Sequence, residues 1–189
     1  MQALPMDGSL FLINLAALLL SVLGIAFFNS SEASLVSVNK IRIRHLAEGG
    51  HVAAQAAQRI MGQVESFFAT ISITVNVLVI FASSIGTALA IAFLGSGEVA
   101  VLVATVAMAM LIVIFGEITP KTLAVPAAER LSLFVARPIE VIMKLESTLI
   151  YLFTLLPRLL MRLARRKMDL KAPFKRPSEC LRSETGANE

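Results

Sequence analysis

The sequence predicts an all-α integral membrane protein with three transmembrane helices, two short helices between the first and the second, and a juxtamembrane amphipathic helical belt. Of the 189 residues, 57% are hydrophobic and 16% are charged, whereas a soluble domain is about 45–50% apolar and about 25% charged. From Ser66 to Gly116 the only ionisable side chain is Glu98, so this stretch has no polar face to present to water. Three apolar stretches approach or exceed the roughly 20 residues that a helix needs to cross a bilayer.

The first apolar stretch covers about residues 9–28. It is longer than the roughly 7–15 residues of a signal-peptide core, and residues 1–9 contain no Lys or Arg to precede such a core. We therefore predict a retained first span. After it, the composition of residues 36–46 and 52–61 predicts two short helices, which a pair of glycines separates.

The second and third spans are predicted to form an antiparallel hairpin. They cover about residues 67–94 and 99–118, and a glycine-rich turn joins them. Beyond them, apolar and charged residues mix over about 127–163, where no uncharged run is long enough to cross a membrane. This pattern predicts amphipathic helices at the interface. A fourth span is the alternative, and it would place the C-terminus outside.

The positions of the lysines and arginines predict the orientation. Four lie between the first two spans and the other 13 lie after residue 120, whereas residues 1–9 and the hairpin turn have none. The positive-inside rule then places the N-terminus outside and the C-terminus in the cytoplasm, for a multi-pass protein of the inner or plasma membrane. We treat residues 1–166 as one transmembrane domain. The basic segment 167–189 is expected to be a disordered tail that favours anionic membrane lipid.

Composition argues against several function classes. The chain has one cysteine and two histidines, which match no metal-ligand spacing and no catalytic arrangement, so we expect it not to be an enzyme. With one tyrosine and no tryptophan, it lacks the aromatic platform of a single-strand nucleic-acid binder, and we expect no nucleic-acid partner.

Polar residues at membrane depth mark a candidate site, because they are costly there. In chain order these residues are Asn29, Ser30, Ser31, Glu32, Asn76, Gly116 and Glu117. Pro120 is expected to break the third helix and free carbonyl oxygens. Carboxylate, amide, hydroxyl and carbonyl oxygens together suit a hard cation. For Ser31 and Glu32, capping of the following helix is the alternative.

Small residues recur along the second span. Ala82, Gly86 and Ala90 lie four residues apart and so share one face of a helix. Such a stripe predicts close approach of another helix, for which a dimer seam is one candidate.

Three segments resemble motifs of a known family. Residues 28–35 (FNSSEASL), 74–78 (TVNVL) and 113–121 (VIFGEITPK) are similar, in order and spacing, to elements of the CNNM/CorC magnesium transporters. The corresponding family motifs are FSxSExAL, GNxLVN and VxxFGEIxPK, of which the last is the specific one. The resemblance covers about residues 10–165. It implies the fold predicted above, assembled as a homodimer.

The resemblance also implies Mg²⁺ transport, generally efflux, with proposed coupling to Na⁺. The implied ligands are Ser31, Asn76, Glu117 and the Gly116 carbonyl, with Asn29 and Ser30 as further candidates. Val79 and Ile80 occupy the place of the second asparagine of the family's second motif. A non-transporting membrane scaffold or regulatory protein with a degenerate cation site is therefore the alternative. The family usually carries a cytoplasmic pair of CBS domains, and we expect no room for them in a chain of this length.

Overall fold

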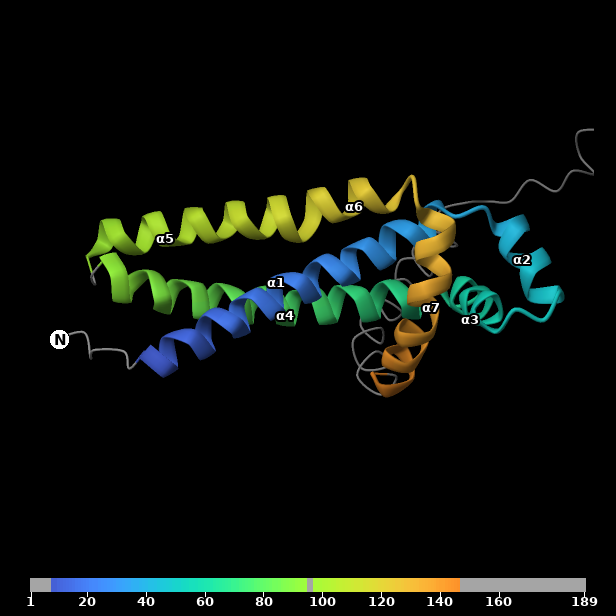
Figure 1. The fold of residues 1–189 in the computed structure, drawn as a ribbon, viewed down its shortest axis with the longest axis horizontal. Coiled ribbons are helices and arrows are strands. Elements are labelled where there is room, and N and C mark those ends of the chain that lie inside the picture. The colour runs from blue at the N-terminus through green and yellow to red at the C-terminus, as the bar shows by residue number, and fades with distance from the viewer. Residues whose placement is uncertain (1–7, 95–96, 147–189) are drawn as a thin grey trace, which may run out of the picture. The chain divides into compact units, whose positions relative to one another are not determined.

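The structure, a computed structural model, describes residues 8–94 and 97–146. Every regular element in these ranges is a helix, which confirms the predicted fold class (Figure 1). In chain order the elements are α1 (Gly8–Ser37), α2 (Lys40–Glu48), α3 (Val52–Met61), α4 (Val64–Leu94), α5 (Glu98–Leu111), the π-helix η1 (Ile112–Ile118), α6 (Thr119–Ala124) and α7 (Ala128–Leu145).

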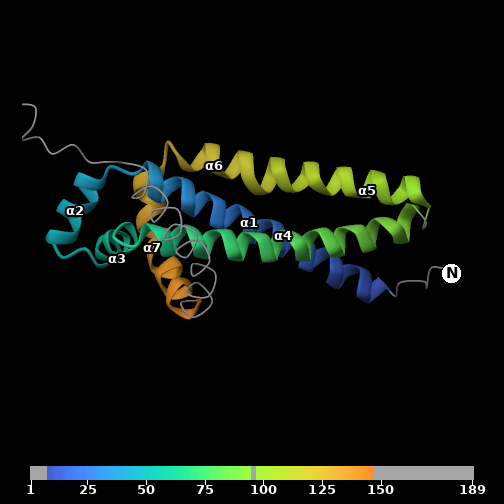
Figure 2. The ribbon, with the colours of Figure 1, turned by 180° about the vertical axis from the view of Figure 1, so that it is seen from behind.

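Three helical stretches are long and apolar enough to cross a membrane: α1, α4, and the stretch from Glu98 to Ala124 that α5, η1 and α6 form together. They lie alongside one another in both ribbon views, and α4 contacts α1 and α5 (Figures 1 and 2). Large apolar side chains point outward from each of them, as in Leu20 (69% exposed), Ile80 (66%) and Leu102 (65%). Apolar surface of this extent suits lipid and not water. The chain is therefore a multi-pass membrane protein.

The first span is longer than predicted. α1 does not end near residue 28 but continues to Ser37, so Ser31 and Glu32 lie inside it and do not cap the next helix. Asn39 caps α2 instead, because its side-chain oxygen accepts two backbone N–H groups at 3.0 and 3.3 Å. The first short helix accordingly begins at Lys40, later than predicted, while α3 coincides with its prediction.

The small-residue stripe of α4 packs inside the chain. Ala82 is fully buried in a cluster that includes Leu18 and Ile25 of α1 and Met108 of α5. Gly86 lies directly against the Met108 side chain, where a Cβ atom would collide with it. The stripe therefore brings α5 close to α4, and a dimer seam is not needed to explain it.

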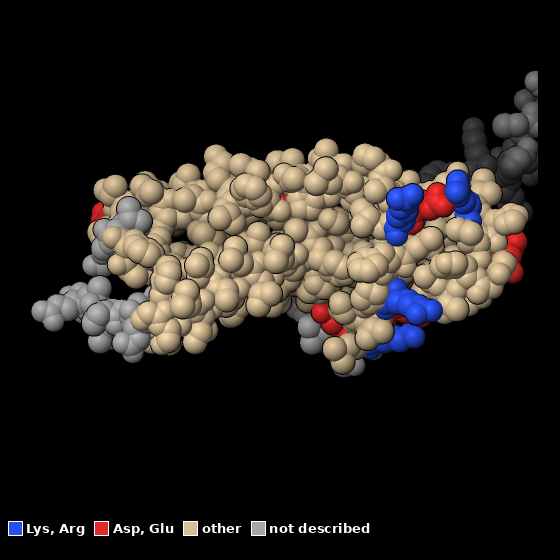
Figure 3. Space-filling view, viewed as in Figure 1, with Lys and Arg blue, Asp and Glu red and all other residues tan. Residues whose placement is uncertain are grey.

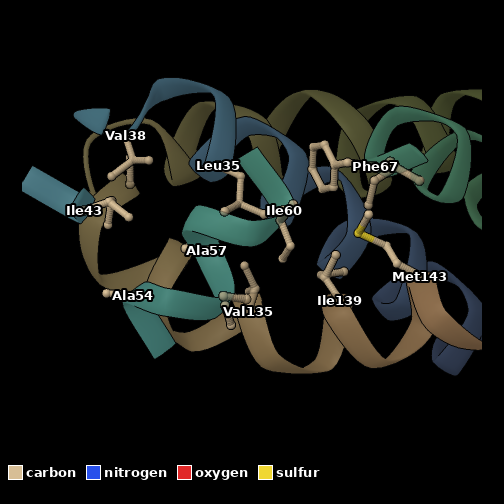
Figure 4. Packing of buried hydrophobic residues seen from close by; sticks show 14 of the residues in the cluster. Leu35, Val38, Ile43, Ala54, Ala57, Ile60, Phe67, Val135, Ile139 and Met143 are labelled. Atoms are coloured by element: carbon tan, nitrogen blue, oxygen red, sulfur yellow. The ribbon is translucent and has the colours of Figure 1, made fainter. Parts of the chain in front are cut away.

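The juxtamembrane helix α7 is amphipathic, as predicted. Val135, Ile139 and Met143 repeat every four residues and are buried. They pack against Ile60 of α3 and Phe67 of α4, as the close view shows (Figure 4). This second core holds the short helices against the ends of the spans.

Several predictions fall on residues outside the described ranges. They are the hairpin turn at 95–96, the belt beyond residue 146 and the tail at 167–189. The uncharged run at 147–157, on which the alternative fourth span depends, lies there too.

Charged residues gather at the end of the bundle where α2, α3 and α7 lie, while the visible face of the long helices is almost free of them (Figure 3). Arg59 of α3 donates from Nε and Nη2 to the two carboxylate oxygens of Glu140 on α7, at 2.8 and 2.9 Å. Lys144 lies 3.2 Å from the same carboxylate. The hydrogen bonds from Arg59 lower the pKa of Glu140 from 4.5 to about 2. This pair ties α3 to α7.

Replacing Glu140 should weaken that tie in a pH-dependent way. Because folding lowers the pKa of Glu140, its stabilising effect is complete above about pH 4.5 and is lost as the pH falls toward about 2. Glu140→Gln should lower the melting temperature of the detergent-purified protein at pH 7 by about 2–4 °C. The difference from wild type should shrink below pH 4.5, as measured by circular dichroism.

Arg44→Ala is the matched control, since Arg44 pairs with Glu48 of its own helix and both side chains are exposed. We expect this variant to have the same melting temperature as wild type at every pH. A Glu140→Gln difference that stays constant between pH 7 and pH 3 would contradict the assigned pair.

Candidate functional site

Polar groups meet where the last turns of α1 contact η1 and α6. The side-chain amide of Asn29 donates from Nδ2 to the carbonyl oxygen of Gly116 at 2.8 Å. The hydroxyl of Ser30 donates to the carbonyl oxygen of Pro120 over a longer 3.4 Å. Asn29 is only 4% exposed, so this amide is committed to the contact between the two spans.

Pro120 explains why the Gly116 carbonyl is available. In a regular α-helix this oxygen would accept the backbone N–H of residue 120, and proline has none. The helix nevertheless does not break as predicted, because η1 widens into π geometry, in which the N–H of Thr119 bonds to the carbonyl of Ile114 five residues back. The span then continues through α6 to Ala124. The expected freed carbonyl is present, without the expected break.

Gly116 also sets how closely the two spans approach. A Cβ atom there would lie 2.9 Å from Cγ2 of Ile25, which is fully buried on α1. Isoleucine is stiff at χ1 and has little freedom to move aside. Only glycine therefore lets η1 come near enough for its carbonyl to meet Asn29.

Two buried serines complete the α1 side. Ser31 is fully buried and donates to the carbonyl of Phe27 at 2.7 Å, and Ser34 donates to the carbonyl of Ser31 at 3.0 Å. Their hydrogens are thus used within α1. Each hydroxyl oxygen keeps lone pairs with which it can bind a cation.

Glu117 is the acidic residue of η1 nearest in sequence to this group. It follows Gly116 directly and is half-buried. No cluster of three His, Cys, Asp or Glu side chains occurs in the described ranges. The available ligands are therefore mixed oxygens around one carboxylate, a set that suits Mg²⁺ better than zinc or copper.

The structure does not bring Asn76 to the other predicted ligands. Its side chain is exposed on α4 and donates to the carbonyl of Ser72 at 2.8 Å on the same helix. Close to it on α4, Val75, Leu78 and Val79 pack in the apolar cluster that also contains residues of α1 and α5. Within one chain the group therefore consists of Asn29, Ser30, Ser31, Gly116 and Glu117.

An ion pair lies beside this group. Lys121 of α6 contacts Glu32 of α1, with Nζ and Oε2 2.9 Å apart. The sequence predicts Glu32 as a helix cap or a polar residue of the first span, and it does not predict this pair. The signal that could have identified the pair is its place in the two motifs, directly after Ser31 and after Pro120.

Comparison with known proteins gives consistent matches. A family model described as the cyclin M transmembrane N-terminal domain matches residues 15–179. A UPF0053 protein of Haemophilus influenzae is 32% identical over 171 residues, which cover 90% of this chain and 39% of that protein. The UPF0053 inner membrane protein YfjD of Escherichia coli is 28% identical over 148 residues, which cover 77% of this chain and 33% of that protein. The chain thus spans about a third to two fifths of the length of these relatives.

Gly116→Ala should disrupt the contact between α1 and η1. The added methyl group meets Ile25, and overpacking of this kind costs about 1–3 kcal/mol. We expect a lower melting temperature for the purified protein. Gly8→Ala, which adds a methyl where nothing lies within 4 Å, should leave it unchanged.

Combining Gly116→Ala with Ile25→Ala tests the cause. The double variant should lose less free energy of unfolding than the two single variants lose together, because removing the Ile25 side chain makes room for the new methyl group. Strict additivity would show that the methyl group does not act through Ile25.

Proposed function

The chain belongs to the cyclin M transmembrane N-terminal domain family, and we propose that it transports divalent cations, with Mg²⁺ efflux as its main activity and Na⁺ as the coupling ion. The observation that carries the proposal is the contact of Asn29 with the carbonyl of Gly116, which the half-buried Glu117 follows directly in the chain. Polar groups are brought together there between two spans, where irregular backbone is tolerated when it serves a site.

The proposed ligands are the oxygens of Asn29, Ser31, Gly116 and Glu117, with Ser30 at the edge of the group. Mg²⁺ prefers oxygen ligands and gives up its water slowly, so it keeps several waters when proteins bind it. The carboxylate of Glu117 attracts the ion, while the neutral oxygens around it keep the binding weak enough for release. That balance is what a transport site requires.

The charged end of the molecule supports the proposed orientation in the membrane. Lysine and arginine gather over α2, α3 and α7, which the positive-inside rule assigns to the cytoplasm (Figure 3). The proposed site lies where α1 approaches that end, since α1 contacts α7 as well as η1. An ion reaching the site from the cytoplasm would therefore cross the longer part of the spans on its way out. The protein would then lie in the inner or plasma membrane with its N-terminus on the outer side.

A homodimer in contact with membrane lipid is part of the same proposal. The amide of Asn76 is exposed on α4, where large apolar side chains such as Val77, Ile80 and Phe81 are exposed around it. An amide in hydrocarbon gains by bonding across to another helix. A second copy of α4 would provide a matching amide.

A non-transporting scaffold or regulatory protein is the second candidate. The observation that favours it is that Val75 and Val79, which stand close to Asn76 on α4, are apolar and pack in the cluster that contains Leu18 and Ile25 of α1. Under this reading, the polar group of α1 and η1 would serve helix packing alone.

Flux measurements distinguish the two. Glu117→Gln and Asn29→Ala should each reduce Mg²⁺ flux in proteoliposomes at least about tenfold, because each removes one ligand from a small set. Thr105→Val is the control, since Thr105 is exposed on α5 and its hydroxyl bonds to the Val101 carbonyl of the same helix. Wild-type flux in Glu117→Gln would remove the assigned site. A wild type with no flux, and with no thermal stabilisation by millimolar Mg²⁺, would favour the scaffold.

Asn76→Leu tests the dimer. Loss of the exposed amide should shift the purified protein toward the monomer, as measured by size-exclusion chromatography with light scattering. Thr105→Val should keep the wild-type distribution. An unchanged dimer in Asn76→Leu would contradict the role proposed for α4.

A further inference from the structure

The ion pair of Glu32 and Lys121 joins the same two elements as the proposed cation site. Nζ of Lys121 lies 2.9 Å from Oε2 of Glu32, and the two side chains are 44% and 25% exposed. Glu32 follows Asn29 by three residues on α1, and Lys121 follows Glu117 by four residues across η1 and α6. Side chains three or four residues apart on a helix are neighbours. The pair therefore lies about one turn from the proposed ligands on each element.

The charges of this region do not match a divalent ion while the pair is closed. Glu32 and Glu117 carry two negative charges, and Lys121 cancels one of them. An ammonium group one turn from Glu117 also repels an approaching cation. If Lys121 moves away from Glu32, the two carboxylates together balance the charge of Mg²⁺.

The chemistry of the pair suits exchange. A lysine ammonium is a compact charge on a flexible stem, so its 2.9 Å contact with Glu32 does not fix the geometry of either side chain. The Arg59–Glu140 pair of the belt differs, because a planar guanidinium makes two hydrogen bonds to one carboxylate. The Arg59–Glu140 pair therefore has a fixed geometry, whereas the Lys121–Glu32 pair can separate more easily.

We propose that Lys121 is a tethered counter-cation of the transport site and that Glu32 is the carboxylate it exchanges with the divalent ion; this rests on the proposed function. A Mg²⁺ ion that enters from the cytoplasmic end binds Glu32 in place of Lys121. The carboxylates of Glu32 and Glu117 then both face the ion. When the ion leaves, Lys121 returns to Glu32. Its charge then opposes rebinding from the side that the ion has left.

Equilibrium binding of Mg²⁺ to the full chain in detergent tests this directly. In isothermal titration at pH 7.5 and low salt, Lys121→Gln should bind Mg²⁺ about two- to fivefold more tightly than wild type, the range expected for a partly exposed ion pair. Glu32→Gln should bind Mg²⁺ at least about two- to fivefold more weakly than wild type. Lys121→Arg keeps the charge and should stay within about twofold of wild type.

Two further variants keep the result interpretable. Arg44→Gln removes a positive charge from the exposed Arg44–Glu48 pair of α2 and should leave the affinity unchanged. Lys121→Met replaces Lys121→Gln if the latter does not melt cooperatively, and the same increase in affinity is expected. An unchanged or lower affinity in a folded Lys121 variant would overturn the counter-cation, and wild-type affinity in Glu32→Gln would overturn the role of Glu32.

The outcomes separate this inference from the function on which it rests. If wild type binds Mg²⁺ and the Lys121 variants bind with the same affinity, only the counter-cation is refuted. If neither wild type nor Lys121→Gln binds Mg²⁺, the transport site itself fails and the inference fails with it.

Discussion

The hydrogen bond from Asn29 to the Gly116 carbonyl decides how the first and third spans meet. It depends on three features that lie close together in the third span. Pro120 supplies no N–H for the carbonyl, Gly116 has no Cβ to keep α1 away, and the π turn carries the helix past the proline. Without any one of them, the amide would lack its acceptor or could not reach it. Glu117 and Ser31 take their positions from the same approach of the two helices.

α1 links this contact to the juxtamembrane belt. The helix is unbroken from Gly8 to Ser37, and it contacts η1 and α6 as well as α7. Leu35, six residues beyond Asn29, is buried in the belt core with Val135 and Ile139 (Figure 4). Because a helix moves as a rigid element over such a distance, a shift of α1 would change both contacts together. The belt and the proposed site are therefore mechanically coupled, whatever drives the motion.

Much of the fold could be predicted from the sequence, because hydropathy and charge constrain spans strongly. The three spans, the short helix at Val52–Met61 and the amphipathic α7 agree with the residues that predicted them. The end of α1 could not be predicted, because the polar residues from Asn29 to Glu32 look like the end of a span. The residue that caps the next helix, Asn39, lies further along in the following polar segment. Local propensity does not distinguish a polar helix end from a polar contact between helices.

The composition of the site was less predictable than the fold. α4 is apolar on all sides, so its pattern does not indicate which face packs inward, and Asn76 turns out to be exposed. Pro120 predicted that a carbonyl of the third span is freed, but π geometry has no signature in residue pattern alone. The pairing of Lys121 with Glu32 depends on the register between two distant helices. That register follows from the Gly116 contact and not from any local sequence.

The most direct test of the account is to locate a bound divalent ion by anomalous scattering, with Mn²⁺ in place of Mg²⁺, in crystals of the protein. The account predicts one ion between α1 and η1, about 2.1–2.2 Å from the Gly116 carbonyl oxygen and from a Glu117 carboxylate oxygen. An ion bound elsewhere, with Glu117 turned to bulk solvent and Asn29 still closed on Gly116, would contradict it.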